Sequence, residues 1–143
     1  MKRNTILAEL SHADFPRKLK LEINTVHHYD DTDQVIAWSE HADEQVLVTA
    51  ISLEKMMELK FNALIDRKEI RDAFDIEFLM RRGVTGKISA NHIRSVQSVI
   101  AGFKPADYKV KLGSIVSAED RKYYNENGFR FLTENLDLLE TRH

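Results

Sequence analysis

The stretch Leu53–Gly83, LEKMMELKFNALIDRKEIRDAFDIEFLMRRG, predicts two consecutive helices. Apolar residues recur at positions i, i+3, i+4, i+8 and i+11 from Leu53, so they share one helical face. Lys60 occupies the i+7 position of that face, where a charge is costly unless it is paired or meets a ligand. Asp72 and Asp75 lie three residues apart and share one face of the second helix. We therefore expect the Lys60 ammonium to lie beside both carboxylates in a shared pocket.

These charged residues also have simpler interpretations, which the residues alone leave open. Lys60 can pack its stem against apolar neighbours and place its ammonium in water. The two aspartates can form surface ion pairs at i,i+4 spacing with Lys68 and Arg71. The functional alternative is that Lys60 binds phosphate at a cleft, with Arg67 seven residues later on the same basic face.

The rest of the chain changes character near residue 50. Before that point, strands are predicted at Lys18–Tyr29, Val35–Trp38 and Gln45–Ala50. The first of these ranges alternates apolar and polar residues, which is typical of a strand. Strands followed by helices predict an α+β protein, with a strand-rich part at residues 1–50 and a helical part at residues 51–143. Helices are predicted from the N-cap Ser52 to Ile65, from a capping box of Asp66 and Glu69 to Arg82, and at Ser89–Ala101, Ala118–Glu126 and Phe129–Leu139.

Composition excludes several classes of protein. The 143 residues contain no cysteine, so disulfides and thiolate metal sites are ruled out. Apolar runs fall well short of the roughly 20 residues that span a bilayer, and the first residues make a poor signal peptide. We expect a cytoplasmic protein with no membrane partner. The net charge of −2 gives no sign of a nucleic-acid footprint.

Three sequence motifs resemble those of the AbiEii/AbiGii-type toxin nucleotidyltransferases. The family helix E-L-x-x-x-K-x-x-A-L is partly matched, and the following x-x-R-x-x-x-R-D-x-x-D is matched fully. The family strand K-x-E-I-N resembles Leu19–Asn24, with Glu22 in its middle. The matching residues of the two helical motifs are Lys60, Ala63, Leu64, Arg67, Arg71, Asp72 and Asp75.

The resemblance implies a fold like part of DNA polymerase β and a toxin of a type IV toxin–antitoxin pair. Such enzymes use a nucleoside triphosphate and Mg²⁺, and some relatives transfer nucleotides to tRNA. By this resemblance Glu22 would be a metal ligand, and Lys60 the lysine on the triphosphate side. Asp72 and Asp75 would join Lys60 as catalytic residues, and nucleotide binding would fall to Lys60, Arg67 and Arg71.

The first catalytic motif of the family, Gly-Ser followed about ten residues later by Asp-x-Asp, is missing from the sequence. Gly113-Ser114 is followed only by the adjacent Glu119-Asp120, and Asp31-Thr32-Asp33 has no Gly-Ser before it. We therefore expect this chain to be the C-terminal part of such an enzyme and to be inactive by itself. Its uncovered strand edges would favour a homo-oligomer or pairing with a separately encoded N-terminal part. The alternative is a non-enzymatic interaction module that binds an antitoxin or RNA.

Overall fold

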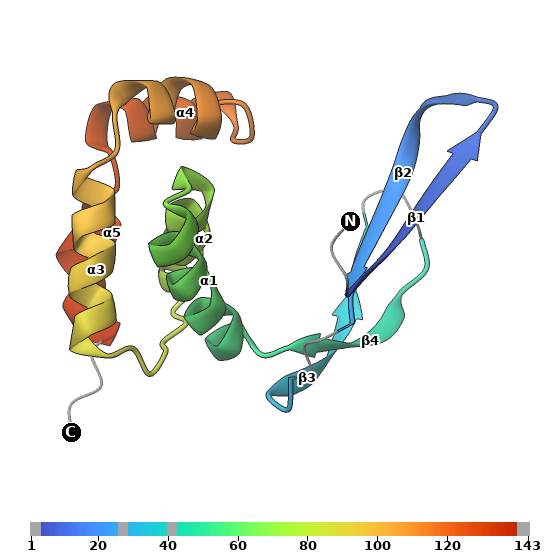
Figure 1. Cartoon of the computed structure of the whole chain (residues 1–143), viewed down its shortest axis with the longest axis horizontal. Coiled ribbons are helices and arrows are strands. Elements are labelled where there is room, and N and C mark those ends of the chain that lie inside the picture. The colour runs from blue at the N-terminus through green and yellow to red at the C-terminus, as the bar shows by residue number, and fades with distance from the viewer. Residues whose placement is uncertain (1–3, 26–28, 40–42, 140–143) are drawn as a thin grey trace.

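The computed structural model describes residues 4–25, 29–39 and 43–139. In these residues two β-hairpins come first and five α-helices follow, which confirms the predicted α+β class (Figure 1). The change from strand to helix occurs at Ser52, between the last strand and the first helix. The likeness to DNA polymerase β stays a prediction.

The first hairpin joins β1 (Thr5–His12) to β2 (Phe15–Asn24) in an antiparallel pair. Sequence analysis missed β1. The range predicted for β2, Lys18–Tyr29, starts three residues too late and runs past the end of the strand at Asn24. Residues 26–28 of that range lie outside the described residues. The register places Glu9, Lys20 and Glu22 on one face, together with Leu7, and an apolar set on the other face. The apolar face contains three cross-strand pairs: Ile6 with Ile23, Ala8 with Leu21, and Leu10 with Leu19.

The second hairpin joins β3 (Thr32–Ala37) to β4 (Val46–Ile51), close to the predicted ranges. One face carries Val35 opposite Val48, and the other carries Ile36 opposite Leu47. The described strands form two separate two-stranded sheets, and a two-stranded sheet is at best marginally stable by itself in water.

The stretch Leu53–Gly83 forms the two predicted helices, α1 (Leu53–Arg67) and α2 (Ile70–Arg81). Ser52 is the N-cap of α1, as predicted, and its hydroxyl accepts a hydrogen bond from the Lys55 N–H. The predicted capping box was wrong. Asp66 belongs to α1, which ends when Lys68 adopts a left-handed φ of 54°, and Glu69 is the N-cap of α2 without a side-chain cap bond.

The C-terminal half adds α3 (Ala90–Ala101), α4 (Ala118–Asn127) and α5 (Arg130–Asn135). Ser89 is the N-cap of α3, and a short 3₁₀ helix at Leu136–Leu139 completes the predicted last helix. A π-helical segment at Asp107–Leu112 was not predicted. It ends at Gly113, where a Cβ would collide with the Lys109 carbonyl, so this position requires glycine.

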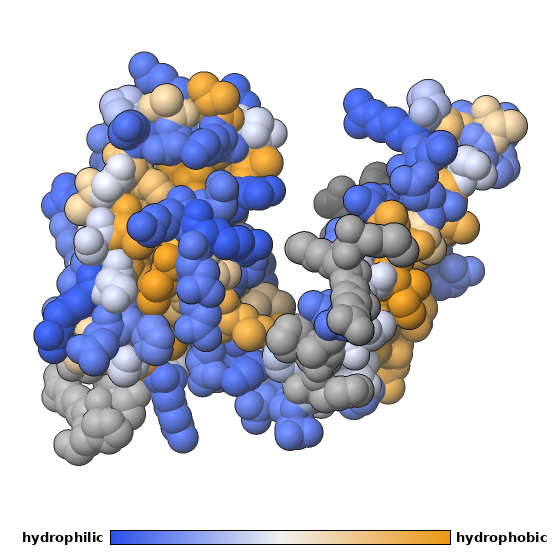
Figure 2. All heavy atoms as spheres, viewed as in Figure 1, coloured by the Kyte–Doolittle hydropathy of each residue, from blue (hydrophilic) through white to orange (hydrophobic). Residues whose placement is uncertain are grey.

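The hydrophobic core lies in the helical part. Met57, Phe61 and Leu64 from the predicted α1 stripe are almost fully buried, whereas Leu53 at its start is exposed. Most apolar side chains of the hairpins are exposed instead, and Figure 2 shows orange surface along the strands. The strand part is therefore held by backbone pairing more than by a core. Its exposed large apolar residues are Ile6, Leu7, Leu10, Phe15, Leu19, Leu21, Ile23, Val35, Ile36, Trp38, Val46 and Leu47.

Candidate functional site

Lys60 and the two aspartates meet between α1 and α2, as the sequence predicts. The Lys60 ammonium donates a hydrogen bond to Asp75 Oδ2, and it lies 3.7 Å from Asp72 Oδ1. The Lys60 side chain is 31% exposed, so its charged end is paired without being sealed from solvent. The simple interpretation of a lysine reaching only for water is therefore wrong for this residue.

Asp72 is the buried centre of this cluster, because the residue is only 2% exposed. Both of its carboxylate oxygens accept hydrogen bonds from Arg67 Nη2, at 2.8 and 3.0 Å. Arg67 ends α1 and Asp72 lies in the first turn of α2, so this contact joins the two helices across their connection. A buried carboxylate is tolerated when it is paired and hydrogen-bonded in this way.

In the described part of the chain, Lys68 does not pair with Asp72 and Arg71 does not pair with Asp75, so the predicted surface ion pairs at i,i+4 spacing do not form. Lys68 lies outside α2, and Asp72 pairs with Arg67 and Lys60 instead. Arg71 is exposed in the first turn of α2 and makes no ion pair with a described residue, because Asp75 pairs with Lys60. We call Lys60, Arg67, Asp72 and Asp75 the cation–aspartate cluster.

Sequence analysis missed a second buried carboxylate, Glu77 of α2, which is 0% exposed. Its Oε1 accepts hydrogen bonds from Arg81 at 2.8 and 3.0 Å and from the Tyr124 hydroxyl at 3.1 Å. Its Oε2 accepts the backbone N–H of Leu132 at 3.1 Å. The available signal was its spacing, because Glu77 lies four residues after Ala73 and seven after Ile70 on the buried face.

Two pKa shifts accompany this carboxylate. Burial, together with the nearby negative charge of Glu77, raises the pKa of Tyr124 well above its ordinary value of 10.0. Burial alone would lower the pKa of Arg81, but hydrogen bonds to Glu77 and Tyr123 outweigh it and the pKa is raised. Tyr124 therefore stays neutral and Arg81 stays charged near neutral pH.

A groove of about 400 Å³ lies elsewhere, between α2 and α4. Aromatic rings supply most of its wall, and carboxylates and Arg81 supply its polar part. Arg81 also lies 4.2 Å from the Phe131 ring centroid, so its charge is already engaged. The groove is lined by Phe74, Phe78, Arg81, Glu119, Asp120, Tyr123 and Tyr124, so it does not include the predicted site.

The family described as nucleotidyl transferase AbiEii toxin, type IV toxin–antitoxin system, matches residues 5–126, which is most of the chain and includes the whole cluster. The chain belongs to the AbiEii nucleotidyltransferase toxin family. No curated protein and no solved structure matches it.

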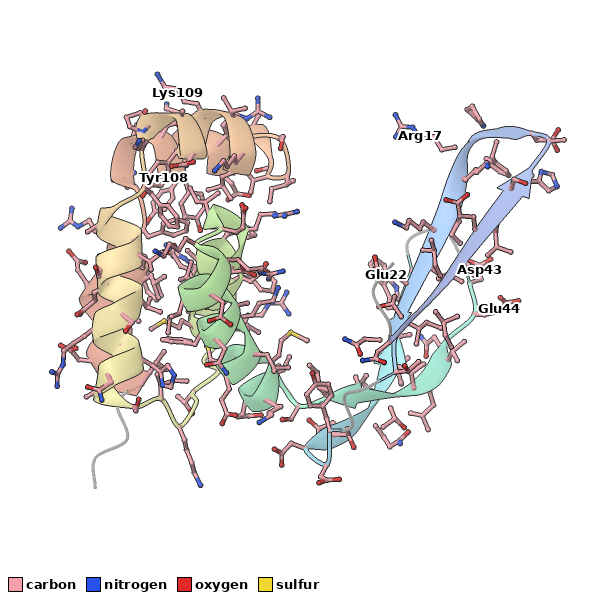
Figure 3. All side chains as sticks on the ribbon, in the orientation of Figure 1. Arg17, Glu22, Asp43, Glu44, Tyr108 and Lys109 are labelled. Atoms are coloured by element: carbon pink, nitrogen blue, oxygen red, sulfur yellow. The ribbon has the colours of Figure 1, made fainter. Side chains whose placement is uncertain are left out.

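Membership in the AbiEii family suggests nucleotide and metal use in general, and it implies an antitoxin partner. The described residues include no group of three potential metal ligands from histidine, cysteine, aspartate and glutamate. Asp72 and Asp75 are already engaged by cations. Figure 3 shows Glu22 on β2, well apart from α1 and α2. The metal-ligand role of Glu22 stays a prediction.

No helix in the described residues of this AbiEii member is long and apolar enough to cross a membrane.

Proposed function

We propose that this AbiEii-family chain binds the phosphate groups of a nucleotide at Lys60 and Arg67. The observation that carries the proposal is the cation–aspartate cluster itself. Two cationic side chains from α1 converge on buried Asp72 and keep part of their surface exposed. Ammonium and guanidinium groups held in this way are typical phosphate binders.

Each member of the cluster has a distinct role in this proposal. Asp72 holds Arg67 through one terminal nitrogen only, so the other guanidinium donors are not engaged by any described residue. Asp75 holds the Lys60 ammonium at the cluster's open side, where an incoming phosphate can share or replace that contact. The aspartates are thus positioning residues, and exposed Arg71 supplies a further positive charge in the first turn of α2.

We further propose that the chain does not transfer nucleotides by itself. Two-metal phosphoryl-type chemistry needs convergent carboxylates that hold both ions and activate the attacking hydroxyl. The Gly-Ser and Asp-x-Asp motif that supplies them in the family is missing from this sequence. The aspartates of the cluster are committed to Lys60 and Arg67, which argues against their serving that role.

Phosphate binding is tested by titrating the chain with a fluorescent nucleoside triphosphate, with and without EDTA. We expect binding to persist in EDTA, because cations of the protein carry it. Lys60→Met should weaken binding about tenfold, since one charge-assisted hydrogen bond is lost. Lys60→Arg should retain most of the affinity because it keeps the charge.

The matched control is Lys55→Met, which removes a lysine of the same helix that pairs with Glu58. This variant should bind as the wild type does, and circular dichroism should show that all variants keep their helices. Equal affinity of Lys60→Met and wild type would overturn the proposed phosphate site.

The inactivity proposal has its own assay. The chain is incubated with labelled nucleoside triphosphates, Mg²⁺ and bulk tRNA, the acceptor that we propose for the complete reaction. We expect label on tRNA at the level of a sample without protein. Robust labelling would show that this chain carries its own catalytic carboxylates.

The alternative function is an interaction module for an antitoxin or RNA without nucleotide chemistry. The exposed apolar side chains of both hairpins favour it, because exposed apolar patches commonly mark interaction sites. Such a module does not require Lys60 to bind a nucleotide. A nucleotide affinity that is unaffected by Lys60→Met would therefore favour this second function.

A further inference from the structure

The outer edge of β2 is a strand edge that the described part of the chain leaves open. The first sheet contains only β1 and β2, so each strand has one edge without a strand neighbour among the described residues. Lys20 and Glu22 of β2 make no ion pair with a described residue, although Lys18 pairs with Glu9. An open edge with unused backbone groups is a template for another strand.

The hydrogen-bond pattern shows which residues present their backbone outward. The N–H of Thr25 donates to the Asn4 carbonyl at 3.0 Å, at the end of the β1–β2 ladder. Backbone direction alternates along an antiparallel strand, so Ile23, Leu21 and Leu19 also bond toward β1. Lys20 and Glu22 therefore direct their N–H and C=O groups to the open edge.

The charge order along β2 is self-complementary. If β2 pairs antiparallel with β2 of a second copy about Leu21, Lys20 stands opposite Glu22 of that copy, and Glu22 opposite its Lys20. Both ion pairs fall on the polar face, while Leu19 meets Ile23 of the second copy on the apolar face. A shift of the centre to Lys20 would set Lys20 opposite Lys20 beside two Lys18–Glu22 pairs, and a shift to Glu22 would set Glu22 opposite Glu22. Both shifted registers thus contain a like-charge pair, which is destabilising, whereas the register centred on Leu21 contains none.

The edge of β1 lacks this property. Glu9 is the charged residue of β1, so pairing β1 with its own copy sets Glu9 opposite Glu9, Leu7 or Thr5 in the registers that keep the apolar face together. None of these registers forms an ion pair. The self-complementary pattern therefore belongs to β2 alone within the first hairpin.

We propose that β2 is a self-association strand that pairs antiparallel with β2 of a second copy, centred on Leu21. The pairing joins two hairpins into one four-stranded antiparallel sheet. Two strands alone are marginally stable, whereas three or more with an apolar face support an independent sheet. Each Lys20–Glu22 pair also exchanges two backbone hydrogen bonds across the new edge.

Single cysteines test the register, because the chain has no cysteine of its own. Leu21 would face Leu21 of the second copy in a pair without hydrogen bonds, where the Cα atoms lie about 4.5 Å apart and a disulfide fits. We expect Leu21→Cys to form a disulfide-linked dimer under mild oxidation. A mixture of Leu19→Cys and Ile23→Cys should cross-link far better than either variant alone.

The matched control is Ala8→Cys, which lies on the same apolar face opposite Leu21 within the hairpin. Position 8 of one copy would be three strands from position 8 of the other, roughly 14 Å away, so it should not cross-link. Cross-linking of Ala8→Cys as strong as that of Leu21→Cys would overturn edge pairing, and so would a monomer at high concentration by light scattering.

Charge reversal supplies a second readout. Glu22→Lys replaces both Lys20–Glu22 pairs of the dimer with lysine opposite lysine. Within its own hairpin, position 22 lies opposite Leu7, so the substitution breaks no pair there. We expect a dimer dissociation constant about tenfold higher by sedimentation equilibrium. Glu44→Lys makes the same charge change at an exposed position outside the strands and should leave it unchanged. Equal effects of the two substitutions would overturn the proposal.

Discussion

Glu77→Ala is expected to lower the free energy of unfolding by about 3–5 kcal/mol, which is the usual effect of breaking a buried, hydrogen-bonded ion pair. Chemical denaturation followed by circular dichroism measures it. The loss is large because Glu77 is completely buried, and the buried Tyr124 hydroxyl and Leu132 N–H then lose the carboxylate that accepts their hydrogen bonds. For a domain of this size such a loss is a large share of the total stability.

The position of Glu77 explains why it matters to the helical part as a whole. α5 has no side-chain cap of its own, and the Glu77 carboxylate accepts the N–H of Leu132 in its first turn. A negative group at that end also favours the helix dipole. The same carboxylate holds Arg81 and, through the Tyr124 hydroxyl, α4. One side chain of α2 thus fixes two later helices.

Two further variants make the Glu77 result decisive. Glu77→Gln keeps a hydrogen-bond acceptor and the side-chain shape, so it should cost clearly less than Glu77→Ala. Glu134→Ala removes a carboxylate that pairs with Arg130 at the surface, and it should cost less than about 1 kcal/mol. If Glu77→Ala cost no more than Glu134→Ala, Glu77 would not be the link between the helices.

The helices around the candidate site were predictable because their determinants are local. The apolar stripe of α1, the Ser52 cap and the glycine after α2 lie within a few residues of the elements that they define. Gly83, just beyond the end of α2, has a φ of 78°, a conformation that favours glycine. Spacing within each helix was also enough to predict that Lys60 would meet Asp72 and Asp75.

What sequence analysis missed depends on distant contacts or on backbone choices that spacing does not show. Glu77 is bonded to residues 47 and 55 positions later in the chain, so its spacing shows a buried charge without showing its partners. The predicted capping box at Asp66 was wrong because α1 runs through Asp66 to Arg67. The helix ends only where Lys68, a non-glycine residue, adopts a left-handed conformation. β1 was missed because Leu7 interrupts the alternation of Ile6, Ala8 and Leu10 with polar residues.

Glu22 illustrates the limit for the candidate site itself. The alternation of β2 correctly places Glu22 on the polar face, opposite Leu7. Alternation does not say whether that face meets the helices, and in the described structure the hairpin stands apart from α1 and α2 (Figure 3). Local pattern therefore predicted which residues share a face of β2, and it did not predict whether the hairpin meets the helices.

Two apolar residues that look alike in the sequence are expected to differ greatly in their effect on stability. Phe61→Ala should lower the free energy of unfolding by about 3–5 kcal/mol, because Phe61 is 1% exposed in the helical core and its removal leaves a cavity. Leu19→Ala should change it by less than about 0.5 kcal/mol, because Leu19 is 59% exposed on its hairpin. Urea denaturation of dilute protein, below any self-association, measures both.

The comparison also decides where the folding free energy of this chain resides. Both residues belong to regular apolar patterns, one with the helical period and one with the strand period. Only burial distinguishes them, since the transfer of apolar surface out of water is what stabilises a fold. A loss at Leu19 as large as the loss at Phe61 in dilute protein would mean that the hairpins pack into a core of their own, against the exposure of their apolar face.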